Sequence, residues 1–134
     1  MTSALDTDFA PLQRAMQLHA YRQQLLAANI ANADTPNYHA MDLNFSRAYQ
    51  AAMGGAAANL ALRQDQPRQL AAGGASGLAA YVAYQAGNQV GLNGNSVDMN
   101  RQQSAFLKNS VRYEADLTFI TGKIKTMLSA ITGN

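Results

Sequence analysis

The sequence predicts a mainly α-helical protein whose long N-terminal and C-terminal helices pair as an antiparallel coiled coil, with a flexible or small β-containing middle segment. Three observations support this class. Apolar residues recur at alternating spacings of four and three near both ends, alanine and glycine dominate the middle, and turn-forming residues separate these parts. We expect an N-terminal helix over residues 1–34, an irregular middle over 35–95 and a C-terminal helix over 96–134.

The N-terminal helix is predicted from a continuous heptad seam. All its positions except His19 and Gln23 are apolar, and a polar layer of this kind can set the register of a coiled coil. We therefore interpret His19 as a hydrogen-bonded seam residue rather than a metal ligand. The helix should end near residue 33, because Thr35 precedes Pro36 and the residue before a proline is disfavoured in the α region. The seam positions are Leu5, Phe9, Leu12, Met16, His19, Gln23, Leu26, Ile30 and Ala33.

The C-terminal helix shows the same alternation, with Ser110 as its one polar seam position. Asn95 is the expected N-cap, with Asp98 three residues later in a pattern that resembles a capping box. The seam positions are Phe106, Ser110, Tyr113, Leu117, Ile120, Ile124, Met127 and Ile131.

The middle segment gives weaker signals. Residues 35–38 are typical of a turn, in which Asn37 can take the left-handed conformation. A short helix is expected over residues 45–53, and a short strand over residues 81–84, where aromatic and β-branched residues gather. Flexible stretches are expected around residues 54–55 and 73–77, and Asn93 followed by Gly94 indicates a turn before the last helix.

Composition favours a protein that works packed against neighbours. Charged residues make up 13% of the chain, which is about half the usual share for a soluble domain. Each long helix also carries a second apolar face, formed by Leu18, Tyr21 and Leu25 or by Leu107, Val111 and Leu128. We expect a structural assembly subunit whose ends are frayed in isolation and become ordered on polymerisation.

Other interpretations of the helices stay open. The seams could form an intramolecular hairpin with an ordinary core, and such a hairpin could still offer its second faces to neighbours. A different class is a small soluble coiled-coil adaptor or secretion chaperone that acts as a discrete dimer. A helix that lies on a membrane surface is disfavoured, because few Lys or Arg residues occupy the polar faces.

The sequence argues against catalysis and cofactor binding. The chain has no cysteine, and its ten basic residues are dispersed, so disulfides, thiol chemistry and a nucleic-acid patch are not expected. His39 lies near Asp34 and Asp42, but no second His or Cys accompanies it, so no metal site is expected. Glu114 and Asp116 point to different helix faces and do not form an acid–base pair. We expect no enzyme activity, cofactor or small-molecule substrate.

Export signals are also missing from the pattern. No run of apolar residues is long enough for a membrane-spanning helix. Asp6 and Asp8 occupy the region where a secretory signal peptide would carry cations before an apolar core, so no cleaved signal peptide is expected. A protein of this kind that works outside the cytoplasm must leave by another route.

Two blocks of the sequence resemble the bacterial flagellar rod, hook and related axial proteins. Residues 26–38 resemble the N-terminal signature of that family, followed by Tyr38, Asp42 and Phe45, and residues 92–99 resemble its second block. The likeness is closest to the proximal rod members and covers about residues 10–50 and 90–134. The residues that carry it are Ala28, Asn29, Ile30, Ala31, Asn32, Asp34, Thr35, Pro36, Tyr38, Phe45, Asn95, Val97 and Asp98.

The resemblance implies a basal-body rod subunit in the periplasmic space. Such a subunit is exported by the flagellar type III apparatus and assembles helically with itself, with other rod proteins and with the adaptor between rod and membrane ring. The spacing of Asn29 and Asn32 places both on one helix face. We interpret their amides as hydrogen-bonding to nearby backbone; the alternative is that they only weaken the helix end.

Overall fold

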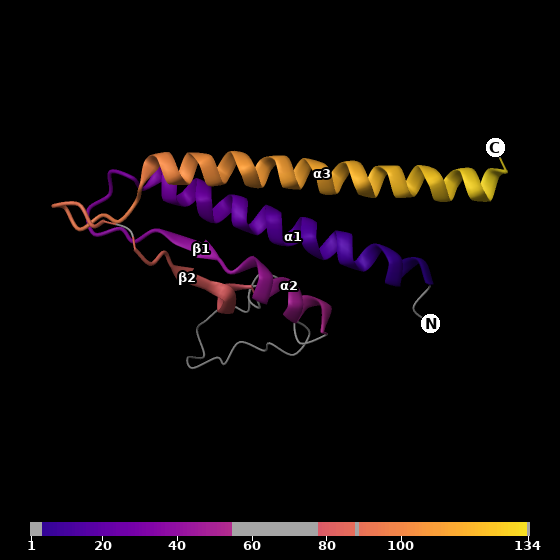
Figure 1. The fold of residues 1–134 in the computed structure, drawn as a ribbon, viewed down its shortest axis with the longest axis horizontal. Helices are drawn as coiled ribbons and strands as arrows, with labels where there is room; N and C mark the ends of the chain where they lie inside the picture. Colours follow the sequence, from indigo (N-terminus) through magenta and orange to yellow (C-terminus); the bar gives the residue numbers. More distant parts are fainter. Residues whose placement is uncertain (1–3, 55–77, 88, 134) are drawn as a thin grey trace, which may run out of the picture.

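The computed structural model describes residues 4–54, 78–87 and 89–133, and it confirms the predicted fold class. Helix α1 (Ala4–Ala31) and helix α3 (Met99–Thr132) run antiparallel side by side, so the N- and C-termini lie at the same end of an elongated molecule (Figure 1). Between them in sequence come strand β1 (Met41–Leu43), helix α2 (Phe45–Met53), the 3-10 turn η2 (Ala79–Tyr81) and strand β2 (Val82–Tyr84). No helix of the described ranges is long and apolar enough to cross a membrane.

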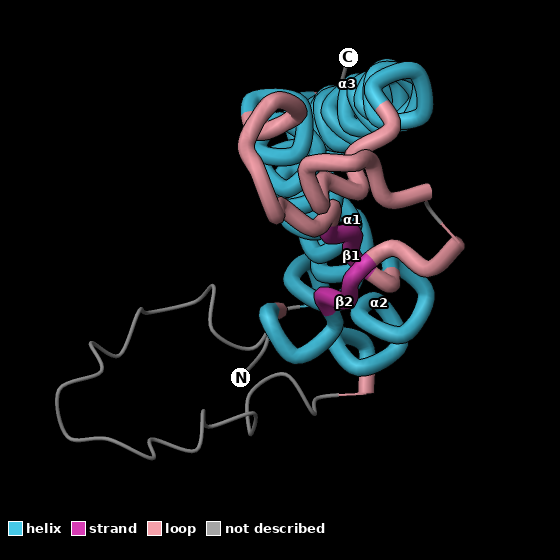
Figure 2. Tube along the Cα trace, turned by 90° about the vertical axis from the view of Figure 1, so that its left-hand side faces the viewer, coloured by secondary structure: helices cyan, strands magenta, loops and turns pink. Residues whose placement is uncertain are grey.

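The elements form three layers with α1 in the middle. Helix α3 covers one side of α1, and the β1–β2 pair with α2 covers the opposite side (Figures 1 and 2). The two strands are antiparallel, with Met41 opposite Tyr84 and Leu43 opposite Val82. Because α1 is sandwiched in this way, it contacts every other layer, whereas α3 keeps a broad outer face.

The small core lies between α1 and the β1–α2 layer. Leu18, Leu43 and Ala48 are its buried members, and Tyr21 and Leu25 pack against them. The sequence-based expectation that Leu18, Tyr21 and Leu25 face neighbouring molecules is therefore wrong, because the middle segment of the same chain covers this face. The matching face of α3 does stay open: Leu107, Val111 and Leu128 are 65%, 71% and 59% exposed.

The contact between α1 and α3 uses the predicted seam on α1. Every described seam side chain from Phe9 to Ala33 is buried or half-buried. On α3 the prediction is half right: Phe106, Tyr113, Ile120 and Met127 are half-buried, but Leu117, Ile124 and Ile131 are 41%, 52% and 79% exposed. These three therefore lie outside the contact with α1.

A polar heptad line replaces the missing apolar one on α3. It consists of Gln102, Asn109, Asp116 and Lys123, spaced seven residues apart. Gln102 and Asn109 are 0% and 1% exposed. These amides are accepted in the seam because α1 carries matching partners, and a hydrogen-bonded buried amide avoids the desolvation penalty that otherwise excludes it.

The ends of the shorter elements follow local chemistry. Helix α2 spans the predicted residues 45–53, and Asn44 caps it by accepting from the Arg47 amide at 3.2 Å. The predicted strand at 81–84 begins one residue later, at Val82, while β1 was not predicted. The expectation that Asn95 caps the last helix is wrong: Asp98 is the N-cap, and its Oδ1 accepts from the Arg101 amide at 3.2 Å. The glycine stretches expected to be flexible, at residues 55 and 73–77, lie outside the described residues.

Candidate assembly interface

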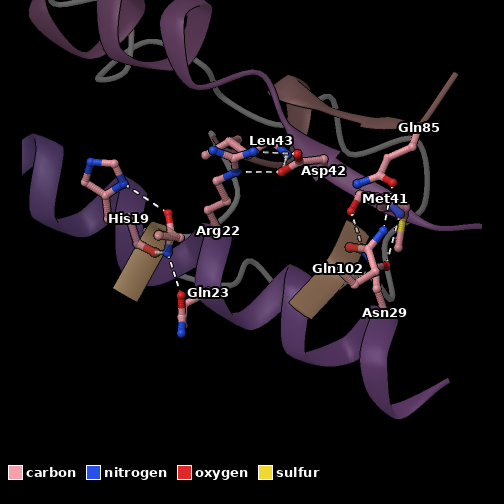
Figure 3. Close-up of polar contacts among 10 residues, drawn as sticks. His19, Arg22, Gln23, Asn29, Met41, Asp42, Leu43, Gln85 and Gln102 are labelled. Atoms are coloured by element: carbon pink, nitrogen blue, oxygen red, sulfur yellow. Dashed lines mark hydrogen bonds and ion pairs between the residues drawn. The ribbon is translucent and has the colours of Figure 1, made fainter. Parts of the chain in front are cut away.

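Asn29 joins three elements at one end of the molecule. It is 0% exposed, and its Nδ2 donates to the Met41 carbonyl at 2.7 Å and to Gln102 Oε1 at 3.0 Å. Its Oδ1 accepts from the Met41 amide at 3.0 Å and from the Tyr38 hydroxyl at 3.2 Å. An amide has two donor hydrogens and two acceptor sites, so Asn29 is fully satisfied. Figure 3 shows it between Met41 and Gln102, and the predicted contact with backbone is confirmed.

Asn32 forms local hydrogen bonds at the C-terminal end of α1. Its Nδ2 donates to the Ala28 carbonyl at 2.8 Å, and its Oδ1 accepts from the Thr35 hydroxyl at 3.1 Å. The Thr35 amide also donates to the Asn32 carbonyl at 3.1 Å. Asn32 thus stabilises the turn that follows the helix, which agrees with the predicted backbone contact.

Asn95, which belongs to the second motif block (residues 92–99), caps the C-terminus of α1. Its Nδ2 lies 2.8, 2.9 and 2.8 Å from the carbonyl oxygens of Asn32, Ala33 and Thr35. The last carbonyls of a helix have no partner within the helix, so an amide donor from outside relieves them. Its Oδ1 accepts from the Val97 amide at 2.7 Å, which turns the chain into α3.

Backbone hydrogen bonds join the two motif blocks, residues 26–38 and 92–99. The Asn37 amide donates to the Asn93 carbonyl at 2.9 Å, and the Ser96 amide donates to the Tyr38 carbonyl at 3.0 Å. Asn37 has the predicted left-handed conformation, with φ 58°, and Gly94 has φ 76°. A Cβ at Gly94 would collide with the Asn37 side chain, so this close approach requires glycine.

The remaining motif residues are distributed around this junction. Ile30 and Val97 are half-buried, and Tyr38 is half-buried, with burial raising the pKa of its hydroxyl. Phe45 lies apart from the junction, on α2, where its ring stacks on His19 at a centroid distance of 4.3 Å. The exposed motif residues are Ala28, Ala31, Asp34, Thr35, Pro36 and Asp98.

A second set of polar contacts holds the middle of the hairpin. Arg22 on α1 donates to both carboxylate oxygens of Asp42 on β1, at 2.8 and 2.7 Å (Figure 3). The pKa of Arg22 is raised, chiefly by this hydrogen bond, although partial burial acts in the opposite direction. Across the α1–α3 seam, Asn109 contacts both His19 and Gln23. The sequence-based reasoning missed Gln102, Asn109 and Asp116, although their seven-residue spacing was a readable signal.

The pair of carboxylates near His39 does not form a metal centre. His39 is exposed, with its ring against Tyr84, and Asp42 is paired with Arg22. Within the described residues, no cluster of three His, Cys, Asp or Glu side chains is placed to hold a metal ion.

The outer side of α3 carries a stripe of large apolar side chains. This stripe consists of Leu117, Ile124, Leu128 and Ile131. Elsewhere on the helix, Leu107, Val111 and Phe119 are also exposed. Leu117, Ile124 and Ile131 are spaced by seven residues and lie next to the half-buried Ile120 and Met127. We call the four residues Leu117, Ile124, Leu128 and Ile131 the outer stripe. It continues the intrachain seam laterally, so a further helix could extend the coiled coil there.

Comparison with known proteins indicates the class of protein to which the paired terminal helices and their junction belong. The family model described as "Flagella basal body rod protein" matches residues 12–39.

Full-length similarity identifies the family. The chain is 36% identical to the flagellar basal body rod protein FlgB of Proteus mirabilis strain HI4320, covering 98% of both chains. It is also 36% identical to the FlgB proteins of Salmonella typhimurium strain LT2, over 99% of both chains, and of Escherichia coli K12, over 100% of both. The chain therefore belongs to the FlgB family of flagellar basal body rod proteins.

Proposed function

We propose that the chain is a structural subunit of the flagellar basal-body rod, polymerising helically through its terminal helices as part of the proximal rod. The observation that carries this proposal is the outer stripe on α3, which the chain leaves exposed. Leu117, Ile124 and Ile131 recur every seven residues, and Leu128 lies between the last two, all beside an existing helix–helix seam. Covering such side chains contributes about 1.5–3 kcal/mol each when burial is complete, so a neighbouring helix would gain substantially by packing there.

The overhang of α3 supports the same role. Lys123 Nζ lies 3.3 Å from Asp8 Oδ2 and 5.4 Å from the centre of the Phe9 ring, close to the start of α1. The last turns of α3 therefore run beyond the start of α1 (Figure 1). We propose that these turns are frayed in the free chain and become ordered when a neighbouring subunit packs on them.

Partners and location follow from the proposed role. The partners are other copies of the chain, other rod proteins and the adaptor between rod and membrane ring. Before assembly the chain engages the flagellar type III export apparatus, and it reaches the periplasmic space without a cleaved signal peptide. In this role the protein is structural and performs no catalysis.

The test uses charge on the outer stripe. Leu117→Asp combined with Ile124→Asp should leave the hairpin folded, because both positions are exposed in the single chain, but it should abolish rod assembly and swimming. The matched control is Thr118→Asp with Thr126→Asp, which places two carboxylates on exposed positions of the same helix that are not part of the stripe. Normal swimming in the stripe variant contradicts the proposal. A compact stable dimer in the purified wild type favours the adaptor or chaperone alternative.

A further inference from the structure

A buried histidine occupies the seam between the terminal helices. His19 on α1 is 6% exposed, and its ring faces two side chains of α3. Nδ1 lies 3.1 Å from Asn109 Oδ1, and Nε2 lies 3.7 Å from Asp116 Oδ2. The Asp116 Oδ2 atom is buried and has no hydrogen-bond partner. Each ring nitrogen of His19 is therefore turned toward an oxygen.

The orientation of the Asn109 amide is fixed by its other contacts. Asn109 Nδ2 donates to the His19 carbonyl at 2.8 Å and to Gln23 Oε1 at 2.6 Å. Gln23 is itself oriented, because its Nε2 donates to Ser110 Oγ at 2.6 Å, and that hydroxyl donates to the Phe106 carbonyl at 3.0 Å. The atom that faces His19 Nδ1 is consequently an acceptor, and Nδ1 must carry a hydrogen.

Neither neutral form of the ring satisfies both oxygens. A ring protonated on Nδ1 alone turns the Nε2 lone pair toward the Asp116 carboxylate, and a ring protonated on Nε2 alone turns a lone pair toward Asn109 Oδ1. The imidazolium ion, with hydrogens on both nitrogens, matches both. The ring also stacks on Phe45 of α2, at 4.3 Å and an interplanar angle of 21°. An aromatic face stabilises a cation.

The other charges near His19 do not reverse this preference. Arg22, one turn along α1, is paired with Asp42 of β1. Lys108 and Arg112 of α3 line a hollow of about 430 Å³ beside Asn109, together with Arg22, and their charge opposes a proton on His19. Both are exposed, so solvent screens them, whereas the Asp116 oxygen that faces His19 is buried.

We propose that His19 joins the two terminal helices through a contact that depends on the protonation of its ring. As an imidazolium ion it bridges Asn109 and Asp116 and holds the middle of α1 on α3; when it loses its proton, this contact weakens. This contact therefore stabilises the folded chain in solution acidic enough to protonate the ring, and it is lost when the pH is raised and the ring is deprotonated. This device acts within one chain and does not depend on rod assembly.

The test compares thermal unfolding, followed by far-UV circular dichroism, at about pH 6 and about pH 8.5, on either side of the histidine titration. The midpoint of thermal unfolding of the wild-type chain should be about 3–6 °C lower at the higher pH, a larger change than in the variants at His19 and Asp116. His19→Gln should be less stable at the lower pH and lose this pH dependence. Asp116→Asn should lose it too, because its amide can donate to the bare Nε2. His39→Gln removes the chain's other histidine, which is exposed, and should keep the wild-type behaviour.

Two further measurements test the proposal: the stability of a variant with a permanent positive charge at position 19, and NMR spectra of the His19 ring. His19→Arg supplies a cation at every pH and should stay stable at about pH 8.5. In the His39→Gln chain the single remaining ring should show hydrogens on both nitrogens in ¹⁵N spectra at about pH 6. A bare ring nitrogen there, a wild-type midpoint independent of pH, or a His19→Gln chain that keeps the wild-type slope would each overturn the proposal. The spectra decide the question if a variant fails to fold cooperatively.

Discussion

Replacing Asn29 with alanine tests the structural role of the motif most sharply. The change removes a fully buried amide and leaves four polar groups without their partner: the Met41 amide, the Met41 carbonyl, Gln102 Oε1 and the Tyr38 hydroxyl. Tyr38 is half-buried, so water can replace its contact. A buried polar group left unsatisfied costs about 1–3 kcal/mol, so the other three together should cost at least about 3 kcal/mol. That is a large share of the stability of a small domain.

The assay is urea unfolding of the purified chain followed by far-UV circular dichroism, with Asn32→Ala as the matched control. Asn32 has the same chemistry three residues away, but its hydrogen bonds are exposed and local. We expect Asn32→Ala to cost about 1 kcal/mol or less. An Asn29→Ala chain within about 1 kcal/mol of wild type, or an equal loss in both variants, would refute the reasoning that the buried amide joins α1, β1 and α3.

Three further predictions concern packing, backbone and dynamics. Leu18→Ala should destabilise the chain by about 2–5 kcal/mol in denaturant unfolding, because Leu18 is 1% exposed in the core, whereas Leu107→Ala, at a 65% exposed position, should change it by less than about 0.5 kcal/mol. Gly94→Ala should lower the melting temperature because of its positive φ and the collision with Asn37, while Gly122→Ala should raise it, since this position has open space in the interior of α3 and alanine favours a helix by up to about 1 kcal/mol. Amides in the last turn of α3 should exchange with solvent faster than those around Asn109 in the free chain, as measured by hydrogen–deuterium exchange; equal protection would contradict the proposed fraying.

Sequence patterns predicted most of the helical framework. The heptad seam on α1, the turn at Asn37 and helix α2 agree with the structure, because each depends on local chemistry or on simple periodicity. Pattern reasoning treats apolar residues as the buried ones, and this assumption fails on α3. There Gln102 and Asn109 are buried, since Asn29 and Gln23 supply their partners, while the aliphatic Leu117 and Ile124 lie outside the contact.

The arrangement of the motif was harder to predict. Asn95 has the composition of a helix cap, and it does act as one, but for the C-terminus of α1 rather than the N-terminus of α3. That role depends on the three-dimensional meeting of two distant blocks, which no local rule encodes. The covering of Leu18 by β1 and α2 is likewise a tertiary effect, since a three-residue strand such as β1 gives almost no periodic signal.

In the assembled rod, the outer stripe of α3 should be covered by a neighbouring subunit. The chain has no cysteine, so Ile124→Cys introduces a single thiol whose reaction with a maleimide can be followed in the free protein and in purified basal bodies. We predict rapid labelling in the free chain, where Ile124 is 52% exposed, and strong protection in the rod, with Thr118→Cys labelled in the free chain as a control for exposure. Equal labelling of Cys at position 124 in the free and assembled states would contradict the account.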